Sequence, residues 1–226
     1  MSTAFGSVNG AINISPTAFL VDVCSKMYLS GWGGTVNSTG NTVGMDVTAT
    51  PPDTVYDKTT DGSDFYLMVL EDDASKLFYA TYFGSPTGAE HVDGGTSRFD
   101  RNGRVYQSVC ASCGGDQNFP ITPGAHSSSN NATAGGRCNN GVFKFDFNLP
   151  IVVADFVTPP IGCTPYTHTF TNLSKGLQTT IYNWNFGDGN TSTTKNPTHT
   201  YTTPGTYTIT LTVSDTGACN FGDTVI

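Results

Sequence analysis

The stretch YNWNFGDGN at residues 182–190 decides the fold of the last third of the chain. The rings of Tyr182, Trp184 and Phe186 alternate with asparagine side chains, and this period of two puts the rings on one face of a β-strand. The sequence GTYTITLTV at residues 205–213 repeats the alternation, with aromatic and aliphatic residues against threonine. The two stretches therefore predict half-buried strands that share one core.

The composition extends this β interpretation to the whole chain. Only 12% of the 226 residues are charged and 26 are glycine, which argues against long salt-bridged helices and coiled coils. The 14 phenylalanines and 10 tyrosines supply apolar surface for packing, so intrinsic disorder is disfavoured. The length allows one large domain or two small ones. We expect an all-β fold.

The charge balance limits the partners of the chain. The formal net charge of -8 repels phosphate backbones and anionic lipids, which argues against nucleic acid as a partner. The longest apolar run, residues 65–70, falls far below the roughly 18 residues that a membrane helix needs, so no membrane insertion is expected. Residues 1–20 lack the cationic start and apolar block of a signal peptide, and we expect an export signal outside this sequence.

The six cysteines indicate where the protein works. An even number of cysteines in a chain rich in glycine and threonine predicts disulfides, and therefore an exported, extracellular protein. Cys110 and Cys113 form a Cys-x-x-Cys pair, which would instead suit a redox couple or half of a zinc site completed by Cys24 and Cys138. No helical periodicity follows this pair, which favours a stapled loop.

Two further cysteines, Cys163 and Cys219, bracket the last third of the chain. We predict that they pair, because a disulfide across a loop of that length stabilises a small module by about 4 kcal/mol. The four earlier cysteines allow three pairings, and the sequence leaves all three open.

The first 150 residues contain two related segments. Residues 21–34 are similar to residues 99–115, which indicates two copies of one antiparallel β unit. The alignment pairs Asp22 with Asp100 and Tyr28 with Tyr106. The Asn-Gly dipeptide inside the second segment predicts a type I′ hairpin turn.

Long irregular stretches occupy matching places in the two copies. Residues 35–61 and 117–137 are too long for simple turns. They are excursions that either cover an exposed sheet face or bind a ligand, and structural cover is the preferred interpretation.

The order of short motifs in this region resembles a known repeat. The sequences FYLMVLEDD, KLFYATYFG, FDRNGRVYQS and NFPITPGAH are similar to β-propeller repeats of the SBBP type, over about residues 18–150. The resemblance implies two antiparallel, propeller-blade-like units in a domain at residues 1–150. It also implies a large surface or gliding-associated protein of Bacteroidetes bacteria. Two units do not close a ring of four to eight blades, so we expect further blades or another cover.

The last third, residues 151–226, resembles the PKD domain. The motifs YNWNFGDGN, NPTHTY and PGTYTITLTVSD occur in the order of that family and span nearly the entire segment. The resemblance implies an immunoglobulin-like β-sandwich that serves as a spacing or recognition module and has no catalytic machinery.

Catalytic signatures are scarce. The chain has only two glutamates, Glu71 and Glu90, and contains neither a GxSxG elbow nor an HExxH motif. Its histidines are scattered, at His91, His126, His168 and His199. Glu90, His91 and Asp93 form a mixed donor cluster, which is either a loop metal site or, preferably, a solvated turn. We therefore expect no enzyme activity.

Three residues are candidate binding or modification sites. Asp188 in the GDG turn is a candidate calcium ligand, and the preferred interpretation is that its carboxylate caps its own turn. Trp32, flanked by glycines, is a candidate platform for stacking on a sugar, and core or interblade packing is the preferred interpretation. Thr54 is a candidate O-glycosylation site, because its DTV sequence fits the motif implied by the Bacteroidetes resemblance and follows two prolines.

One functional hypothesis follows. We expect a noncatalytic segment of a large exported cell-surface protein, acting in adhesion or recognition and as a spacer. Its expected partners are a surface glycan or protein and further modules of the same parent chain, and calcium is the one cofactor considered. The alternative is an accessory carbohydrate-binding region of a secreted hydrolase. A zinc or thiol redox module at the cysteines is a third interpretation.

Overall fold

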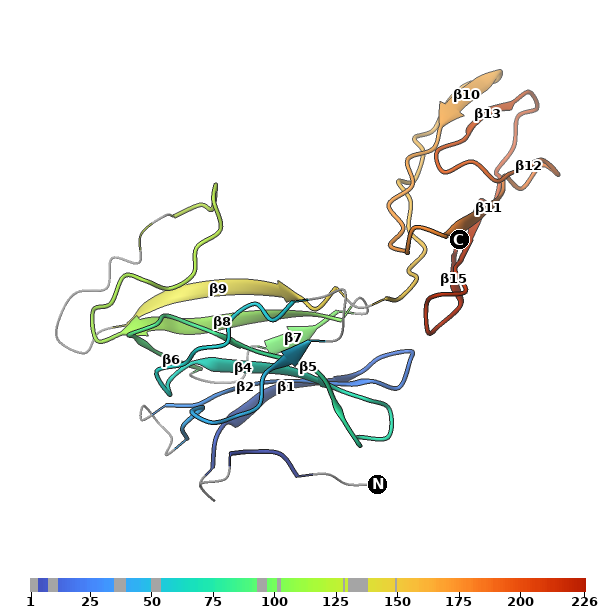
Figure 1. Ribbon diagram of the computed structural model, residues 1–226. Coiled ribbons are helices and arrows are strands. Elements are labelled where there is room, and N and C mark those ends of the chain that lie inside the picture. The colour runs from blue at the N-terminus through green and yellow to red at the C-terminus, as the bar shows by residue number, and fades with distance from the viewer. Residues whose placement is uncertain are drawn as a thin grey trace. The chain divides into compact units, whose positions relative to one another are not determined.

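Figure 1 shows a computed structural model of the protein, in which the described residues form fifteen strands and no helix. The structure describes residues 4–7, 12–34, 40–49, 54–92, 97–100, 103–127, 129, 138–148 and 150–226. In this part of the chain no apolar helix of membrane-spanning length occurs. The chain divides into two compact units, Met1–Asn148 and Leu149–Ile226, here called the N-terminal and C-terminal units. The expectation of an all-β fold is confirmed.

The N-terminal unit contains a five-stranded antiparallel sheet with the order β1-β2-β4-β5-β3. Its strands are β1 (Ser15–Val21), β2 (Met27–Trp32), β3 (Thr48–Ala49), β4 (Phe65–Leu70) and β5 (Leu77–Phe83). Five of the six residues of β4 are buried. Since both faces of this central strand are covered, its sequence is a continuous apolar run and shows no alternation.

The second sheet of this unit is built around the long strand β8 (Arg104–Cys113). One edge of β8 pairs with β9 (Asn139–Asp146), and the other pairs with the short strands β6 (Ala89–His91) and β7 (Ser97–Phe99). Figure 1 shows the two sheets as stacked layers, with β8 and β9 above β4 and β5. The N-terminal unit is therefore a two-layer β structure.

Aromatic rings fill the space between the two layers. The rings of Phe65 and Phe143 lie 5.2 Å apart and those of Phe83 and Phe143 lie 4.4 Å apart, measured between centroids. The buried residues Phe143 and Phe145 of β9 alternate with the exposed residues Lys144 and Asp146. This alternation is the period of a strand with one face in a core.

A second core lies on the outer face of the five-stranded sheet. It consists of Ile14, Met45, Tyr66, Met68, Ala80 and Tyr82. The Tyr82 hydroxyl donates hydrogen bonds to the carbonyl oxygens of Thr42 and Met45, at 3.1 and 2.7 Å. The described residues 40–49 of the first excursion therefore cover this sheet face, whereas residues 35–39 and 50–53 lie outside the described part.

The two aligned hairpins carry the same hydrogen bonds. Asp22 accepts the backbone N–H of Lys26 at 2.9 Å and the hydroxyl of Tyr28 at 2.8 Å. At the equivalent positions, Asp100 accepts the backbone N–H of Arg104 at 3.0 Å and the hydroxyl of Tyr106 at 3.1 Å. The aligned aspartate and tyrosine therefore form equivalent hydrogen bonds in the β1–β2 and β7–β8 hairpins.

The C-terminal unit consists of two small sheets. A two-stranded sheet pairs β10 (Tyr166–Thr169) with β13 (Thr198–Tyr201). A four-stranded sheet has the order β12 (Thr191–Ser192), β11 (Ile181–Asn185), β14 (Thr210–Ser214), β15 (Gly222–Val225). Trp184, Phe186 and Phe170 are almost fully buried in the core of this unit. The prediction that the rings of the FGDG strand share one buried face is confirmed for Trp184 and Phe186.

Paired threonine hydroxyls line exposed parts of this unit. Thr167 and Thr169 of β10 lie opposite Thr200 and Thr198 of β13, with hydroxyl oxygens 2.9 and 2.8 Å apart. Neutral side chains thus hydrogen-bond across the strands where charged pairs often occur.

The predicted strand over residues 205–213 begins later than expected, at Thr210. Thr210 pairs with Asn185, the last residue of β11, and the chain then enters the turn at Gly187. Gly187 has a φ of +79°, and a Cβ there would lie 2.6 Å from the Thr208 carbonyl oxygen. The turn therefore needs glycine and ends β11 before residues 206–209 can join the ladder.

The predicted pairing of Cys163 with Cys219 is wrong. Cys163 is exposed with a free thiol, whereas Cys219 is part of a disulfide. Cys163 lies just before Tyr166, which pairs with Tyr201. The Tyr201 hydroxyl donates a hydrogen bond to the Phe186 carbonyl, beyond the end of the sheet where Asn185 pairs with Thr210. Cys219 lies in the turn after Ser214, at the opposite end of β14. Bracketing in sequence therefore did not bring the two sulfurs together.

Candidate functional site

A disulfide joins the ends of β8 and β9. Cys113 is the last residue of β8, Cys138 precedes β9, and their Cα atoms lie 4.1 Å apart. The bond closes the base of the second excursion, of which residues 128 and 130–137 lie outside the described part. Cys24 is also disulfide-bonded, and Cys110 carries a thiol. The expectation that the four earlier cysteines all pair with one another is therefore wrong, because Cys110 keeps its thiol while Cys113 bonds to Cys138.

Cys110 and Cys113 lie on a strand. A redox pair at the start of a helix gains a lowered thiol pKa from the helix dipole, and β8 offers no such dipole. The interpretation of these two residues as a redox couple has no support from this geometry.

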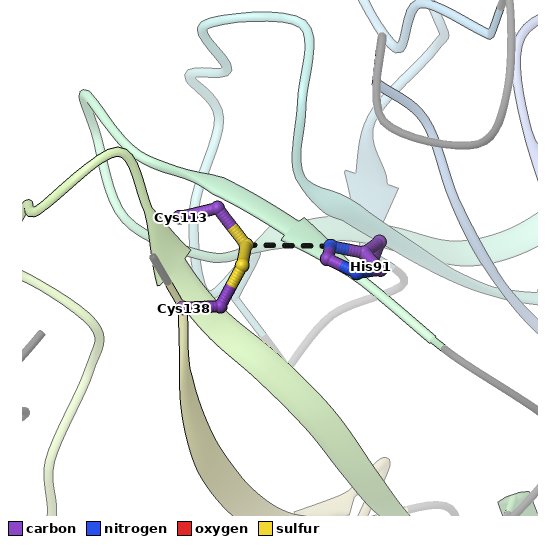
Figure 2. A group of neighbouring side chains, drawn as sticks. All are labelled: His91, Cys113 and Cys138. Atoms are coloured by element: carbon purple, nitrogen blue, oxygen red, sulfur yellow. Dashed lines mark hydrogen bonds between the residues drawn. A yellow bond between two sulfur atoms is a disulfide. The ribbon is translucent and has the colours of Figure 1, made fainter. Parts of the chain in front are cut away.

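His91 lies against the disulfide, as Figure 2 shows. Its Nδ1 atom is 3.3 Å from the Sγ atom of Cys113, and one imidazole nitrogen and both sulfurs lie within 4.8 Å of one another. The side chain is 4% exposed, and its ring lies 5.9 Å from that of Trp32. Among the described residues, this is a group of metal-ligating side chains close enough to share one ion.

The position of His91 follows from the β6–β8 register. His91 pairs with Cys110, and an irregularity between Ala89 and His91 shifts the ladder there. The sequence grouped His91 with Glu90 and Asp93 as donors. In the structure, His91 and Glu90 are neighbours on a strand, where successive side chains point to opposite faces, and Asp93 lies outside the described residues. The ligands that approach His91 are cysteines distant in sequence.

Glu90 belongs to a buried pair of acids that the sequence did not indicate. It is fully buried, and its two carboxylate oxygens accept the backbone N–H groups of Ser85 and Ser112, both at 3.2 Å. Asp64 is 3% exposed. A Cβ on Gly84 would lie 2.1 Å from an Asp64 oxygen and 2.5 Å from a Glu90 oxygen, so the two acids crowd the space above this glycine.

Burial changes the proton affinity of both acids. Burial raises the pKa of Glu90 to about 9. The hydrogen bond from the Ser85 N–H lowers this pKa, and the nearby charge of Asp64 raises it. Burial also raises the pKa of Asp64 to about 6. Perturbed carboxyl groups of this kind occur in active sites. With side chains sealed from solvent, however, this pair can hold protons but does not reach a substrate in the observed conformation.

Trp32 does not form a sugar-stacking platform. The side chain is 4% exposed, so the preferred core-packing interpretation is confirmed and the stacking candidate is wrong. The glycines beside it allow close packing: a Cβ on Gly31 would meet Ile14 at 2.8 Å, and one on Gly33 would meet the Asn13 carbonyl at 2.5 Å. Residues 13 and 14 thus cover the strand that was expected to present the ring.

Asp188 caps its own turn. One carboxylate oxygen accepts the Asn190 N–H at 3.0 Å, and the other accepts a hydrogen bond from Nε2 of His199 at 2.7 Å. The His199 ring stacks on Phe186 at 4.2 Å between centroids. Desolvation alone would raise the pKa of Asp188, but the hydrogen bonds from Asn190 and His199 outweigh it and lower the pKa. These hydrogen bonds confirm the capping interpretation, and calcium ligation by Asp188 stays a prediction.

Thr54 and His126 line an open cavity in the N-terminal unit. The cavity has a volume of about 1300 Å³ and lies along β9. Its walls include Tyr56, Phe83, Phe119 and Phe145, with polar groups of Asn139, Asn140 and Lys144. Thr54 is exposed, as its predicted modification requires, while the preceding residues 50–53 lie outside the described part.

Comparison with known proteins assigns the C-terminal unit. Residues 150–225 match the family model of the PKD domain. A PKD domain is therefore found in the last third of the chain, where the motifs predicted it. The chain is also 52% identical over 48 residues to "Collagenase ColA" of Bacillus cereus. This similarity covers 21% of the chain and 5% of that protein, so the chain spans a small part of the relative it matches.

Proposed function

We propose that the chain is a noncatalytic segment of a large exported cell-surface protein, in which it acts as an adhesion or recognition module and as a spacer. The observation that carries the proposal is the PKD domain at residues 150–225. Its core is a stack of aromatic rings, and its strands are joined at the surface by threonine hydroxyls. The disulfides support an extracellular location, because such bonds persist in oxidising compartments.

The matching hairpins support a repeat organisation of the N-terminal unit. Asp22 with Tyr28 and Asp100 with Tyr106 form equivalent hydrogen bonds in two antiparallel hairpins. We propose that these hairpins belong to two SBBP-type, propeller-blade-like repeats of a Bacteroidetes surface or gliding-associated protein. Exposed Thr54 would carry an O-linked glycan there.

A binding and turnover experiment tests the proposal. The purified chain is applied to arrays of glycans and surface proteins, and separately to panels of glycosidase, peptidase and esterase substrates. We expect saturable binding on the arrays and no turnover. Catalysis that disappears in Asp64→Asn or Glu90→Gln, two variants of the buried acid pair, would refute the noncatalytic assignment.

The cavity along β9 supports a second candidate function, a carbohydrate-binding region that accompanies a secreted hydrolase. Tyr56 is 56% exposed at this cavity, and aromatic faces next to amide groups suit sugar rings. The similarity to a collagenase supports association with an enzyme. Titration with soluble oligosaccharides should then show binding that Tyr56→Ala weakens at least tenfold. Tyr106→Ala, at an exposed tyrosine outside the cavity lining, is the control.

A further inference from the structure

We propose that His91, Cys113 and Cys138 form a redox-gated metal site. When a thiol reductant opens the Cys113–Cys138 disulfide, the two thiolates and the His91 imidazole bind a thiophilic divalent cation such as Zn²⁺. The oxidised form, with the sulfurs bonded to each other, is the one that the structure shows. The inference concerns the N-terminal unit and is independent of the adhesion proposal.

The distances suit a tetrahedral ion. Zinc binds sulfur at about 2.3 Å and imidazole nitrogen at about 2.0 Å, so neighbouring ligand atoms in a tetrahedral site lie about 3.5 to 4 Å apart. The three ligand atoms already lie within 4.8 Å of one another, with Nδ1 of His91 at 3.3 Å from Sγ of Cys113. Opening the disulfide lets the sulfurs separate to that spacing while the imidazole keeps its place.

The imidazole is held in position before any metal arrives. His91 is 4% exposed, lies on a strand that is paired with β8, and packs against the ring of Trp32. Cys113 and Cys138 are only half-buried, so part of each residue is open to solvent. A site with a fixed ligand and an accessible pair of ligands loses little conformational entropy on binding.

The chemistry balances with a thiol as the reductant. Two equivalents of RSH reduce the disulfide to two cysteine thiols and leave as RSSR. Binding of Zn²⁺ then displaces the two thiol protons to solvent and gives a neutral centre of one cation, two thiolates and one neutral imidazole, with water as the fourth ligand. In the reduced form the metal ion would connect Cys113 to Cys138 in place of the disulfide, so the ends of β8 and β9 would be cross-linked in both redox states.

Cobalt binding tests the proposal, because Co²⁺ reports thiolate ligation through its charge-transfer and d–d absorption. The full chain carries Cys163→Ser, which removes the exposed thiol of the C-terminal unit. The protein is reduced with a dithiol, desalted without oxygen and titrated with Co²⁺ and then Zn²⁺. We expect one tetrahedral Co²⁺ per reduced chain, displaced by one Zn²⁺, and no such spectrum for the oxidised chain.

Three variants identify the ligands. Cys138→Ser should abolish the thiolate spectrum at one equivalent, and His91→Phe, which keeps a ring against Trp32, should weaken Co²⁺ binding at least tenfold. Cys110→Ser is the matched control on the same strand and should retain one equivalent, because all three named ligands remain. Circular dichroism of each variant should match that of the parent, which checks that the variant is folded.

Two outcomes overturn the assignment. One is a Co²⁺ affinity and spectrum in His91→Phe equal to those of the parent. The other is a loss in Cys110→Ser as complete as the loss in Cys138→Ser. As a second measurement, Zn²⁺ should raise the melting temperature of the reduced parent and leave that of reduced Cys138→Ser unchanged. An equal rise in both proteins would also contradict the site.

Discussion

The imidazole of His199 donates a hydrogen bond to Asp188 across 2.7 Å, which joins β13 to the turn that ends β11. Since a carboxylate only accepts hydrogen bonds, the proton must sit on Nε2 of His199. The same ring stacks on Phe186, so the turn, the strand and the core are linked through one side chain.

Loss of this link should destabilise the C-terminal unit. Asp188→Ala removes both accepted hydrogen bonds and should lower the free energy of unfolding by about 1 kcal/mol, a typical net value for such bonds near the surface. Asp188→Asn keeps one oxygen for the Asn190 N–H and should cost less. Urea unfolding of residues 149–226 within the full chain, followed by Trp184 fluorescence, measures the difference; equal costs would contradict it.

Acid should act on the same carboxylate. The pKa of Asp188 is lowered in the folded state, so its stabilising contribution is present above the ordinary aspartate pKa of about 4 and is lost as the pH falls through the folded value. We expect the stability difference between the parent and Asp188→Asn to shrink between pH 5 and about 2. A difference that stays constant over this range would contradict the assignment.

The two aligned tyrosines should contribute differently to the free energy of unfolding. Tyr28 is fully buried and Tyr106 is 38% exposed, although each donates to an equivalent aspartate. Tyr28→Phe leaves the Asp22 carboxylate short of a buried donor and should cost about 1 to 2 kcal/mol. Tyr106→Phe, where water replaces the lost donor, should show no measurable change. Chemical denaturation of both variants makes the comparison, and equal effects would argue against burial as the cause.

The buried acid pair predicts a loss of stability at high pH. The folded-state pKa of Glu90, about 9, lies above its ordinary value of 4.5, so the folded protein holds a proton that the unfolded chain releases. The free energy of unfolding should therefore fall as the pH rises from about 5 to 9, and Asp64, with a pKa of about 6, should contribute to the lower part of this range.

Substitutions separate the two glutamates. Glu90→Gln should flatten this pH dependence, while Glu71→Gln, which changes the glutamate paired with Lys26 near the surface, should leave it unchanged. Denaturation midpoints at half-unit pH steps measure the slope. An unchanged slope in Glu90→Gln would show that Glu90 is ionised in the fold at neutral pH.

Alkylation should distinguish the cysteines. Under native conditions, exposed Cys163 should react with a maleimide, and peptides containing Cys113 and Cys138 should stay joined until a reductant is added. Cys138→Ser should lower the free energy of unfolding by about 3 kcal/mol, because the disulfide closes a loop of 25 residues. Cys163→Ser should have little effect. Protection of Cys163 from the maleimide would contradict the observed arrangement.

Local patterns predicted much of the fold. The alternation around Trp184 correctly predicted which side chains are buried, because a strand with one face in a core has apolar residues at every second position. The same rule predicted a strand over residues 205–213, whereas β14 begins at Thr210. The backbone of the Gly187 turn decides where the strand pairing begins, and the side-chain pattern does not show this.

The site required information that neighbouring residues do not contain. His91 meets Cys138 only because β8 pairs with both β6 and β9, and nothing in the Glu90-His91 sequence indicates that contact. Asp64 and Glu90 come together over Gly84 in the same way. Glycines beside Trp32 are compatible with an exposed ring and with close packing, and the structure shows packing, because they admit the Ile14 side chain and the Asn13 carbonyl.

The hydroxyl pairs of Thr167 with Thr200 and Thr169 with Thr198 add hydrogen bonds between β10 and β13 that dissolved ions do not screen. Exposed ion pairs weaken as the Debye length shortens from about 10 Å at 0.1 M salt to about 3 Å at 1 M, but bonds between neutral hydroxyls have no net charge to screen. This part of the pairing between β10 and β13 should therefore keep its strength as the ionic strength rises.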